Sequence, residues 1–202
     1  MITINNKYDS SDLLFSIPVH ERQDIINNTV ENIFNFNPNS KIILHINKTF
    51  TSFDKNLSNY KNLYFNQSNI NYIKGGDLLA YHISNFNYCL NNNINFEYFI
   101  FCASNELFIK KGSVNYINSY KNGIQIINDK RYDDWHNFKK NIENKDFILD
   151  LFNIINSNEL CGGQAEGQFF EINIFKKISD IYLKITNNNE LYINFEAEEI
   201  IP

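Results

Sequence analysis

Short apolar runs alternate along this chain with longer segments in which the apolar residues recur at helical spacing. The apolar runs predict buried strands at Leu13–Val19, Lys41–Asn47, Asn62–Phe65 and Phe96–Cys102. A period of 3.6 residues predicts helices at Glu21–Phe36 and Asp77–Leu90. Strands that alternate with helices in this order are typical of a parallel sheet covered by helices. The first half of the chain therefore predicts an α/β fold with a mostly parallel sheet.

The second half has a less regular pattern. It predicts a strand at Ile124–Ile127, a helix at Lys145–Ile155, a loop at Gly162–Gly167, a strand at Phe169–Phe175 and a further helix to about Ile185. No internal repeat and no linker composition interrupts the sequence. We therefore expect residues 1–202 to form a single domain.

Charge and cysteine content exclude several classes of protein. The net charge is −5 and no basic stripe is present, so a nucleic-acid partner is not expected. Cys89, Cys102 and Cys161 form no CxxC pair, and two of them lie in apolar runs, which fits buried thiols in a reducing cytoplasm. The polar amino-terminus does not resemble a signal peptide, and no apolar run is long enough to span a membrane. These features predict a soluble, cytoplasmic protein.

The common catalytic motifs are absent. No P-loop and no GxGxxG occurs, which argues against an NTPase and against a dinucleotide-dependent oxidoreductase. The sequence also contains no GxSxG and no HExxH motif, so it does not support the common classes of hydrolase that use them.

Polar residues follow the predicted strands where a parallel sheet collects ligands. Val19–Glu21, Asn47 and Ala103–Glu106 each come at the carboxyl end of a strand. In many nucleotide-sugar transferases a metal-binding DxD motif occupies the position of Ala103–Glu106. The single carboxylate here is a weak ligand set for Mg²⁺ or Mn²⁺. We therefore expect any sugar transfer to proceed without a metal, with side-chain cations stabilising the leaving group.

Five stretches resemble a known family. They are Phe15–Glu21 (FSIPVHE), His45–Lys48 (HINK), Gly75–Ser84 (GGDLLAYHIS), Glu97–Gly112 and Gly162–Tyr182. Together they are similar to the core-2/I-branching β-1,6-N-acetylglucosaminyltransferase family, which includes bacterial relatives. The resemblance extends over nearly the whole chain, although each motif is short.

The resemblance implies a GT-A-like (Rossmann-like) fold, a nucleotide-sugar donor and metal-independent, inverting transfer. It also implies a glutamate base, and Asn194–Pro202 (NFEAEEIIP) is similar to the stretch that carries it, which places the base at Glu199 beside Glu198. Two departures stand out: Asn47 replaces the family's usual aspartate, and the chain ends at Pro202 before the family's Arg and Lys. Either the phosphate site is built differently or the chain is C-terminally truncated.

These arguments give a set of candidate site residues. The nucleotide would contact Val19, His20, Glu21, Asn47 and Asp77. Sugar contacts would come from Ser104, Asn105, Glu106 and Trp135, and the catalytic carboxylates would be Glu199 and Glu166, the latter also a candidate acceptor contact.

Structural alternatives stay open for most of these residues. His20 can be a solvated loop residue, Asp77 a helix N-cap, Trp135 a packing residue and Glu198–Glu199 the first turn of a helix. Asn105 and Glu106 can instead hydrogen-bond amides of their own loop, and His82 is expected to be a satisfied core histidine.

The sequence therefore predicts a bacterial glycosyltransferase domain for a surface polysaccharide such as capsule or lipooligosaccharide. It would use a nucleotide-sugar donor, no cofactor, and a glycan or lipid-linked acceptor, which allows peripheral contact with a membrane. The alternative is a catalytically silent module that binds a nucleotide or a glycan.

Overall fold

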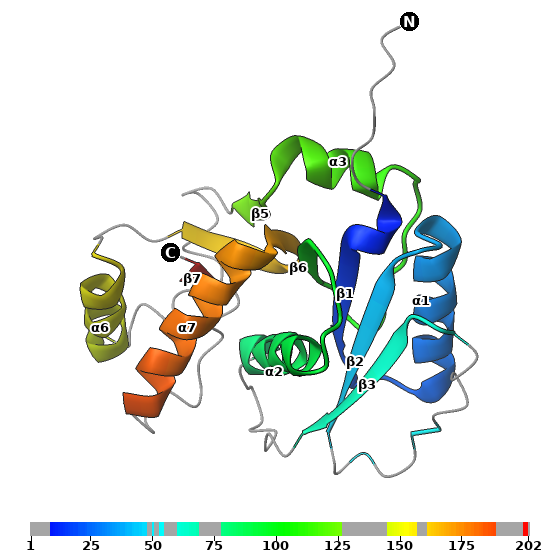
Figure 1. The fold of residues 1–202 in the computed structure, drawn as a ribbon. Helices are drawn as coiled ribbons and strands as arrows, with labels where there is room; N and C mark the ends of the chain where they lie inside the picture. The colour runs from blue at the N-terminus through cyan, green and yellow to red at the C-terminus, as the bar shows by residue number, and fades with distance from the viewer. Residues whose placement is uncertain are drawn as a thin grey trace, which may run out of the picture.

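The computed structural model describes residues 9–47, 50, 53–54, 60–68, 78–126, 145–156, 161–188 and 200–201. Its strands are β1 (Leu13–Pro18), β2 (Lys41–Asn47), β3 (Leu63–Ser68), β4 (Tyr98–Phe101), β5 (Gly123–Ile126), β6 (Cys161–Glu171) and β7 (Ile200–Ile201). Its helices are α1 (Gln23–Phe36), α2 (Leu78–Asn91), α3 (Ser113–Tyr120), α6 (Lys145–Ile155) and α7 (Ile172–Asn188), and a 3₁₀ turn, η1, spans Ser10–Asp12. Figure 1 shows their arrangement.

The strands form one sheet with a parallel and an antiparallel part. The order is β3-β2-β1-β4-β6-β5, and β7 pairs with β6. Strands β3, β2, β1 and β4 are parallel to one another. Strand β6 is antiparallel to β4, β5 and β7. The chain moves outward from β1 to β3 and then returns to the other side of β1 with β4. The predicted fold class, an α/β domain with a mostly parallel sheet flanked by helices, is confirmed.

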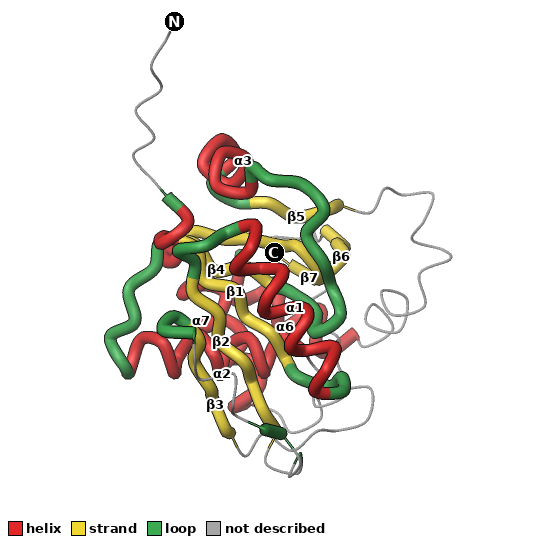
Figure 2. Tube along the Cα trace, turned by 90° about the vertical axis from the view of Figure 1, so that its right-hand side faces the viewer, coloured by secondary structure: helices red, strands yellow, loops and turns green. Residues whose placement is uncertain are grey.

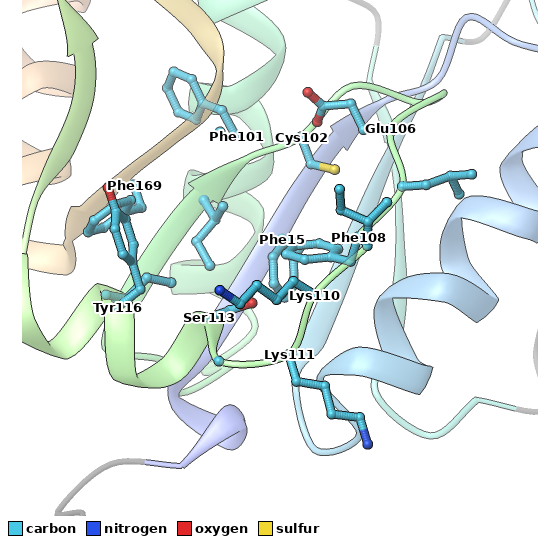
Figure 3. Close-up of a pocket in the computed structure, with 16 residues that line it drawn as sticks. Phe15, Phe101, Cys102, Glu106, Phe108, Lys110, Lys111, Ser113, Tyr116 and Phe169 are labelled. Atoms are coloured by element: carbon cyan, nitrogen blue, oxygen red, sulfur yellow. The ribbon is translucent and has the colours of Figure 1, made fainter.

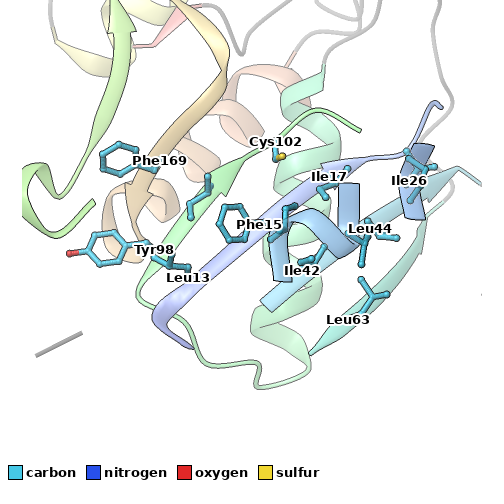
Figure 4. Close-up of a cluster of buried hydrophobic side chains, with 14 of the residues drawn as sticks. Leu13, Phe15, Ile17, Ile26, Ile42, Leu44, Leu63, Tyr98, Cys102 and Phe169 are labelled. Carbon is cyan, nitrogen blue, oxygen red and sulfur yellow. The ribbon is translucent and has the colours of Figure 1, made fainter. Parts of the chain in front are cut away.

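Helices cover both faces of the parallel strands, which explains why those strands read as continuous apolar runs. All six residues of β1 are buried. On one face, α1 packs its buried Ile26, Val30 and Ile33 against residues such as Phe15 (Figures 2 and 4). On the other face, α2 and α7 pack against the sheet in a cluster rich in phenylalanine, which includes Phe86, Phe99, Phe101, Phe170 and Phe175.

A polar network lies inside the contact between α2 and the sheet. Ser16 Oγ lies 2.8 Å from Nδ1 of His82 and accepts a hydrogen bond from Nδ2 of Asn85 at 3.0 Å. Nδ2 of Asn66 on β3 donates to Oδ1 of Asn85 at 3.0 Å. These four residues are buried, and their mutual hydrogen bonds offset the cost of removing them from water. His82 is thus the satisfied core histidine that its position in the helix predicted.

Three elements differ from the sequence prediction. The predicted loop Gly162–Gly167 is part of strand β6, and Phe175, predicted to end a strand, lies inside α7. Helix α3 was not predicted. Strand β6 extends through Gly162 and Gly163 because Gly162 pairs with β7 and Gly163 pairs with β5, and this pairing provides backbone hydrogen-bond partners without help from side chains.

No helix in the described part of the chain combines the length and apolar character needed to cross a membrane.

Candidate functional site

A pocket of about 220 Å³ lies at the carboxyl ends of β1 and β4. Its lining includes Pro18 at the end of β1, His20 after that strand, Ala103 and Asn105 after β4, and Glu166 from β6. The strand order reverses at these two strands, because β2 lies on one side of β1 and β4 on the other. Open α/β sheets bind ligands in the crevice at such a switch point. We therefore take this pocket as the candidate site.

The loops after β1 and β4 are joined by side-chain hydrogen bonds across the site. Ser104 Oγ lies 3.1 Å from Nδ1 of His20, and the carbonyl oxygen of Pro18 lies 3.2 Å from the same nitrogen. Nδ2 of Asn105 donates to Oε1 of Glu21 at 3.2 Å. Two pairs of predicted site residues, His20 with Ser104 and Glu21 with Asn105, are thus in contact. The two members of each pair lie 84 positions apart in the sequence.

Helix α1 also holds the loop that follows β4 through a hydrogen bond. Ser104 is fully buried, and its carbonyl oxygen accepts a hydrogen bond from Oγ1 of Thr29 at 3.0 Å. The amide of Cys102 donates to the carbonyl oxygen of Ser16, which continues the pairing of β4 with β1 past the end of the strand. The side chain of His20, by contrast, is about half exposed to solvent. The site therefore presents an accessible imidazole, that of His20, next to the buried Ser104.

Glu106 turns its carboxylate back toward its own loop. Its Oε2 accepts a hydrogen bond from the amide of Ala103 at 2.8 Å, which is the loop-amide contact that the sequence left open as an alternative. Burial raises the pKa of Glu106, the hydrogen bonds from Ala103 and Cys102 lower it, and the nearby Glu166 charge raises it, so that the pKa lies above its usual value. A contact between Glu106 and a donor sugar stays a prediction.

Glu166 reaches the pocket from a different direction. It is a half-buried residue of β6, the antiparallel neighbour of β4, and it lines the pocket together with His20 and Asn105. Its charge contributes to the raised pKa of Glu106. A carboxylate held on a strand at the wall of such a pocket is suited to accept a proton from a bound hydroxyl group.

The other predicted residues lie apart from this pocket or outside the described residues. The side chain of Val19 is buried in the core on the α1 side of the sheet, and its amide donates to the carbonyl oxygen of His45 at 2.9 Å. Asn47 ends β2 at the same edge of the sheet but does not line the pocket. Asp77, Trp135 and Glu199 fall outside the described residues, as does Glu198. The roles assigned to all of these residues stay predictions.

Helix α2 supplies pocket residues that sequence reasoning did not assign to the site. Leu78 and His82 both line the pocket. They are four residues apart, which places them on the same face of the helix, one turn from each other. This spacing is visible in the sequence, but which helical face meets the pocket depends on how α2 packs on the sheet.

The polar side chains Glu106 and Asn105 of the loop after β4 have hydrogen-bond partners within the protein. The one carboxylate of this loop, Glu106, is engaged with the Ala103 amide, and the Asn105 side chain is engaged with Glu21. Throughout the part of the chain that the structure describes, no three His, Cys, Asp or Glu side chains are grouped so that they could hold a metal ion. The described residues that line the pocket also include no Lys or Arg.

Known proteins with similarity to this chain include a synthase and a transferase. No protein-family profile matches the chain. Over 187 residues it is 28% identical to the chondroitin synthase of Pasteurella multocida (strain Pm70), a match that covers 84% of this chain. The match supports a glycosyltransferase family. It does not single out the core-2/I-branching family that the motifs resemble.

The synthase, and a mannosyltransferase of known structure that is also similar, are both longer than this chain. The match spans 18% of the synthase's own length. Among solved structures, a mannosyltransferase from Pyrobaculum calidifontis, in complex with GDP-Man and Mn²⁺, matches with a TM-score of 0.46 and 10% identity, over 90% of this chain and 53% of that one.

Proposed function

We propose that this chain transfers a sugar from a nucleotide-sugar donor to a glycan acceptor, and that the pocket between the β1 and β4 loops is the site of transfer. The observation that carries the proposal is the pocket itself. It joins His20, Asn105 and a carboxylate, Glu166, at the switch point of the sheet. Similarity to a synthase over most of the chain supports sugar transfer as the reaction class.

The chemistry assigns a role to each element of the site. The loops that carry His20 and Glu21 and, further along the edge, Asn47 would hold the nucleotide, and Ser104 and Asn105 the donor sugar. The acceptor oxygen attacks the anomeric carbon and forms the new glycosidic bond as the bond to the nucleoside diphosphate breaks. The hydroxyl proton passes to a carboxylate. Glu166 is the described candidate for this base, and Glu199 is the candidate that the family resemblance supplies.

We further propose that the transfer is inverting and independent of a divalent metal. A single displacement with one carboxylate base inverts the anomeric centre. The hydrogen bond between Glu106 and Ala103 supports metal independence, because it engages one oxygen of the single carboxylate at the position where a DxD motif would bind the ion. In this proposal the domain works in the cytoplasm on a glycan or lipid-linked acceptor of a bacterial surface polysaccharide.

A second candidate function is a catalytically silent module that binds a nucleotide or a glycan. The specific observation in its favour is the charge of the pocket. Its described lining contains Glu166 but no Lys or Arg to balance a diphosphate leaving group. Such a module would bind its ligand through the same loops without turning it over.

Isothermal titration calorimetry with UDP, GDP and CDP tests the proposal, each in EDTA and in Mn²⁺. We expect one nucleotide to bind equally well in both conditions. If none of the three binds, the transferase proposal is wrong for this chain. Binding that requires Mn²⁺ contradicts metal independence alone. Binding of a nucleotide sugar without its consumption, with glycan acceptor present, favours the silent module.

A further inference from the structure

A second, larger pocket lies beside the candidate site. It has a volume of about 630 Å³ and lies between the loop that follows β4 and helix α3 (Figure 3). Its walls are mainly apolar and include Phe15, Phe108, Ile117 and Phe169. Phe101 and Cys102 line both pockets, so the end of β4 separates the candidate site from this second pocket.

Large apolar side chains surround the mouth of this pocket and face solvent. The exposed fractions are 59% for Leu107, 94% for Ile109 and 59% for Tyr116, and all three line the pocket. Tyr120 is 64% exposed, and the centroid of its ring lies 4.9 Å from the ring centroid of Tyr116. We call these four residues the apolar rim. Isolated exposed apolar residues are common, but a cluster around an apolar pocket marks an interaction surface.

Lysines accompany the apolar rim. Lys110 and Lys111 follow Ile109 in the same loop and line the same pocket, and Lys121 follows the end of α3. Among the described residues no carboxylate forms an ion pair with any of the three. Glu106 is the one acid in the described lining, and it is half-buried and bonded to Ala103. A chain with a net charge of −5 therefore has a basic edge at its exposed apolar cluster.

We propose that the apolar rim and its lysines dock this domain on a membrane surface of anionic phospholipid. Ile109 and Leu107 would enter the boundary between headgroups and acyl chains, where the two tyrosines also fit. The lysines would contact the lipid phosphates. Charge complementarity selects this occupant. A second copy of the chain seated symmetrically on the same surface would bring its own lysines against these and repel them.

Docking in this orientation has a consequence for the candidate site. The loop of the apolar rim begins directly after Ser104 and Asn105, which contact His20 and Glu21. The membrane would therefore lie against the same loop that lines the pocket. This inference does not depend on the proposed function, because lipid binding needs neither donor nor acceptor.

Vesicle co-sedimentation of the 202-residue chain tests the proposal. One set of vesicles contains phosphatidylcholine alone, and the other contains phosphatidylglycerol in addition. We expect binding to the anionic vesicles that weakens as salt is raised. The double substitution Lys110→Gln/Lys111→Gln should weaken binding about fivefold for each lysine. Ile109→Asp should weaken it about tenfold or more, because a charge replaces the inserted side chain.

The chain offers matched controls for both changes. Leu149 on α6 is 58% exposed, and Lys176 and Lys177 are an exposed lysine pair on α7. Leu149→Asp and Lys176→Gln/Lys177→Gln should leave vesicle binding unchanged, and thermal melting should show that every variant is folded. Equal binding to neutral and anionic vesicles, or equal losses in the control variants, overturns the proposal. So does a dimer in size-exclusion chromatography that Ile109→Asp dissociates while vesicle binding is absent.

Discussion

The imidazole of His82 lies flat on the phenyl ring of Phe101, with ring centroids 4.0 Å apart and planes inclined by 3°. Both residues line the candidate site, one from α2 and the other from the end of β4. Burial and, to a smaller extent, the neighbouring His45 together lower the pKa of His82 to about 3. Burial likewise lowers the pKa of His45 to about 4. The contact between helix and sheet therefore accommodates two neutral imidazoles.

These two histidines should make the protein less stable in mild acid. Each has a folded-state pKa below the ordinary value of 6.5, so between pH 6.5 and about 4 the unfolded chain binds protons that the folded chain does not. Stability from this source is complete above pH 6.5 and is lost as the pH falls. Between pH 7 and pH 5 the free energy of unfolding should drop by about 2 kcal/mol for each histidine. Urea denaturation at both pH values measures the drop.

Substitution separates the contribution of His82 from that of other titrating groups. His82→Gln should remove about half of the drop attributed to the two histidines, whatever its effect on stability at pH 7. His20→Gln is the control, because the side chain of His20 is 49% exposed. If His82→Gln shows the same pH dependence as the original chain, the neutral buried imidazole is not the cause.

Loss of the Ser104 hydroxyl should weaken nucleotide binding through His20. In Ser104→Ala the imidazole loses a partner at 3.1 Å, and we expect affinity in calorimetry to fall about fivefold to tenfold, corresponding to about 1–1.5 kcal/mol. Ser119→Ala is the control, since the Ser119 hydroxyl donates to the carbonyl oxygen of Asn115 within α3, away from the site. Once His20 is replaced by Ala, the Ser104→Ala change should cost little more. Full additivity of the two changes would argue against this coupling.

Replacement of Glu166 should affect turnover more than binding. In Glu166→Gln the side chain keeps its size but cannot accept the proton of the acceptor hydroxyl. We expect kcat to fall by about 10²–10⁴ with nucleotide affinity unchanged. Glu171→Gln, five residues along the same strand, is the matched control. Normal turnover in Glu166→Gln combined with loss in Glu199→Gln would assign the base to Glu199 instead.

Gly123 should not tolerate a side chain. It pairs with Phe169 across β5 and β6, and a Cβ atom on Gly123 would overlap the Phe169 ring. Gly123→Ala should lower the free energy of unfolding in urea by about 1–3 kcal/mol. In a Phe169→Leu background the same change should cost less, because the smaller side chain leaves room. An equal cost in both backgrounds would show that the overlap is relieved elsewhere.

Strong local periodicity explains which elements the sequence predicted well. Lys41–Asn47 and Lys145–Ile155 have the same bounds in prediction and structure. The first is a continuous apolar run buried between layers, and the second has a clear apolar stripe. The segment Gly162–Gly167 of strand β6 was predicted to be a loop because Gly162, Gly163 and Gly167 favour turns locally, whereas the strand was predicted from Phe169 onward. Its pairing with distant strands overrides that preference, and such pairing is not visible in local sequence.

The same distinction applies to the candidate site. The contact of His20 with Ser104 follows from a general rule, since loops at the carboxyl ends of neighbouring parallel strands must lie close together. The position of Glu166 does not, because it depends on β6 running antiparallel beside β4. The engagement of Glu106 with the Ala103 amide depends on the exact turn of the loop. Residue types indicated the candidates, and tertiary packing decided how each is used.

The hydrogen bonds that Ser16 and Asn66 make with α2 limit how this sequence can change in evolution. Inserting one residue near the start of α2 would rotate Leu78 and the residues before the insertion by about 100° relative to Asn85. Either the pocket wall or the network would then lose its side chains, and buried polar groups without partners are costly. Relatives that keep this arrangement should therefore differ in the length of their loops but keep the spacing from Leu78 to Asn85.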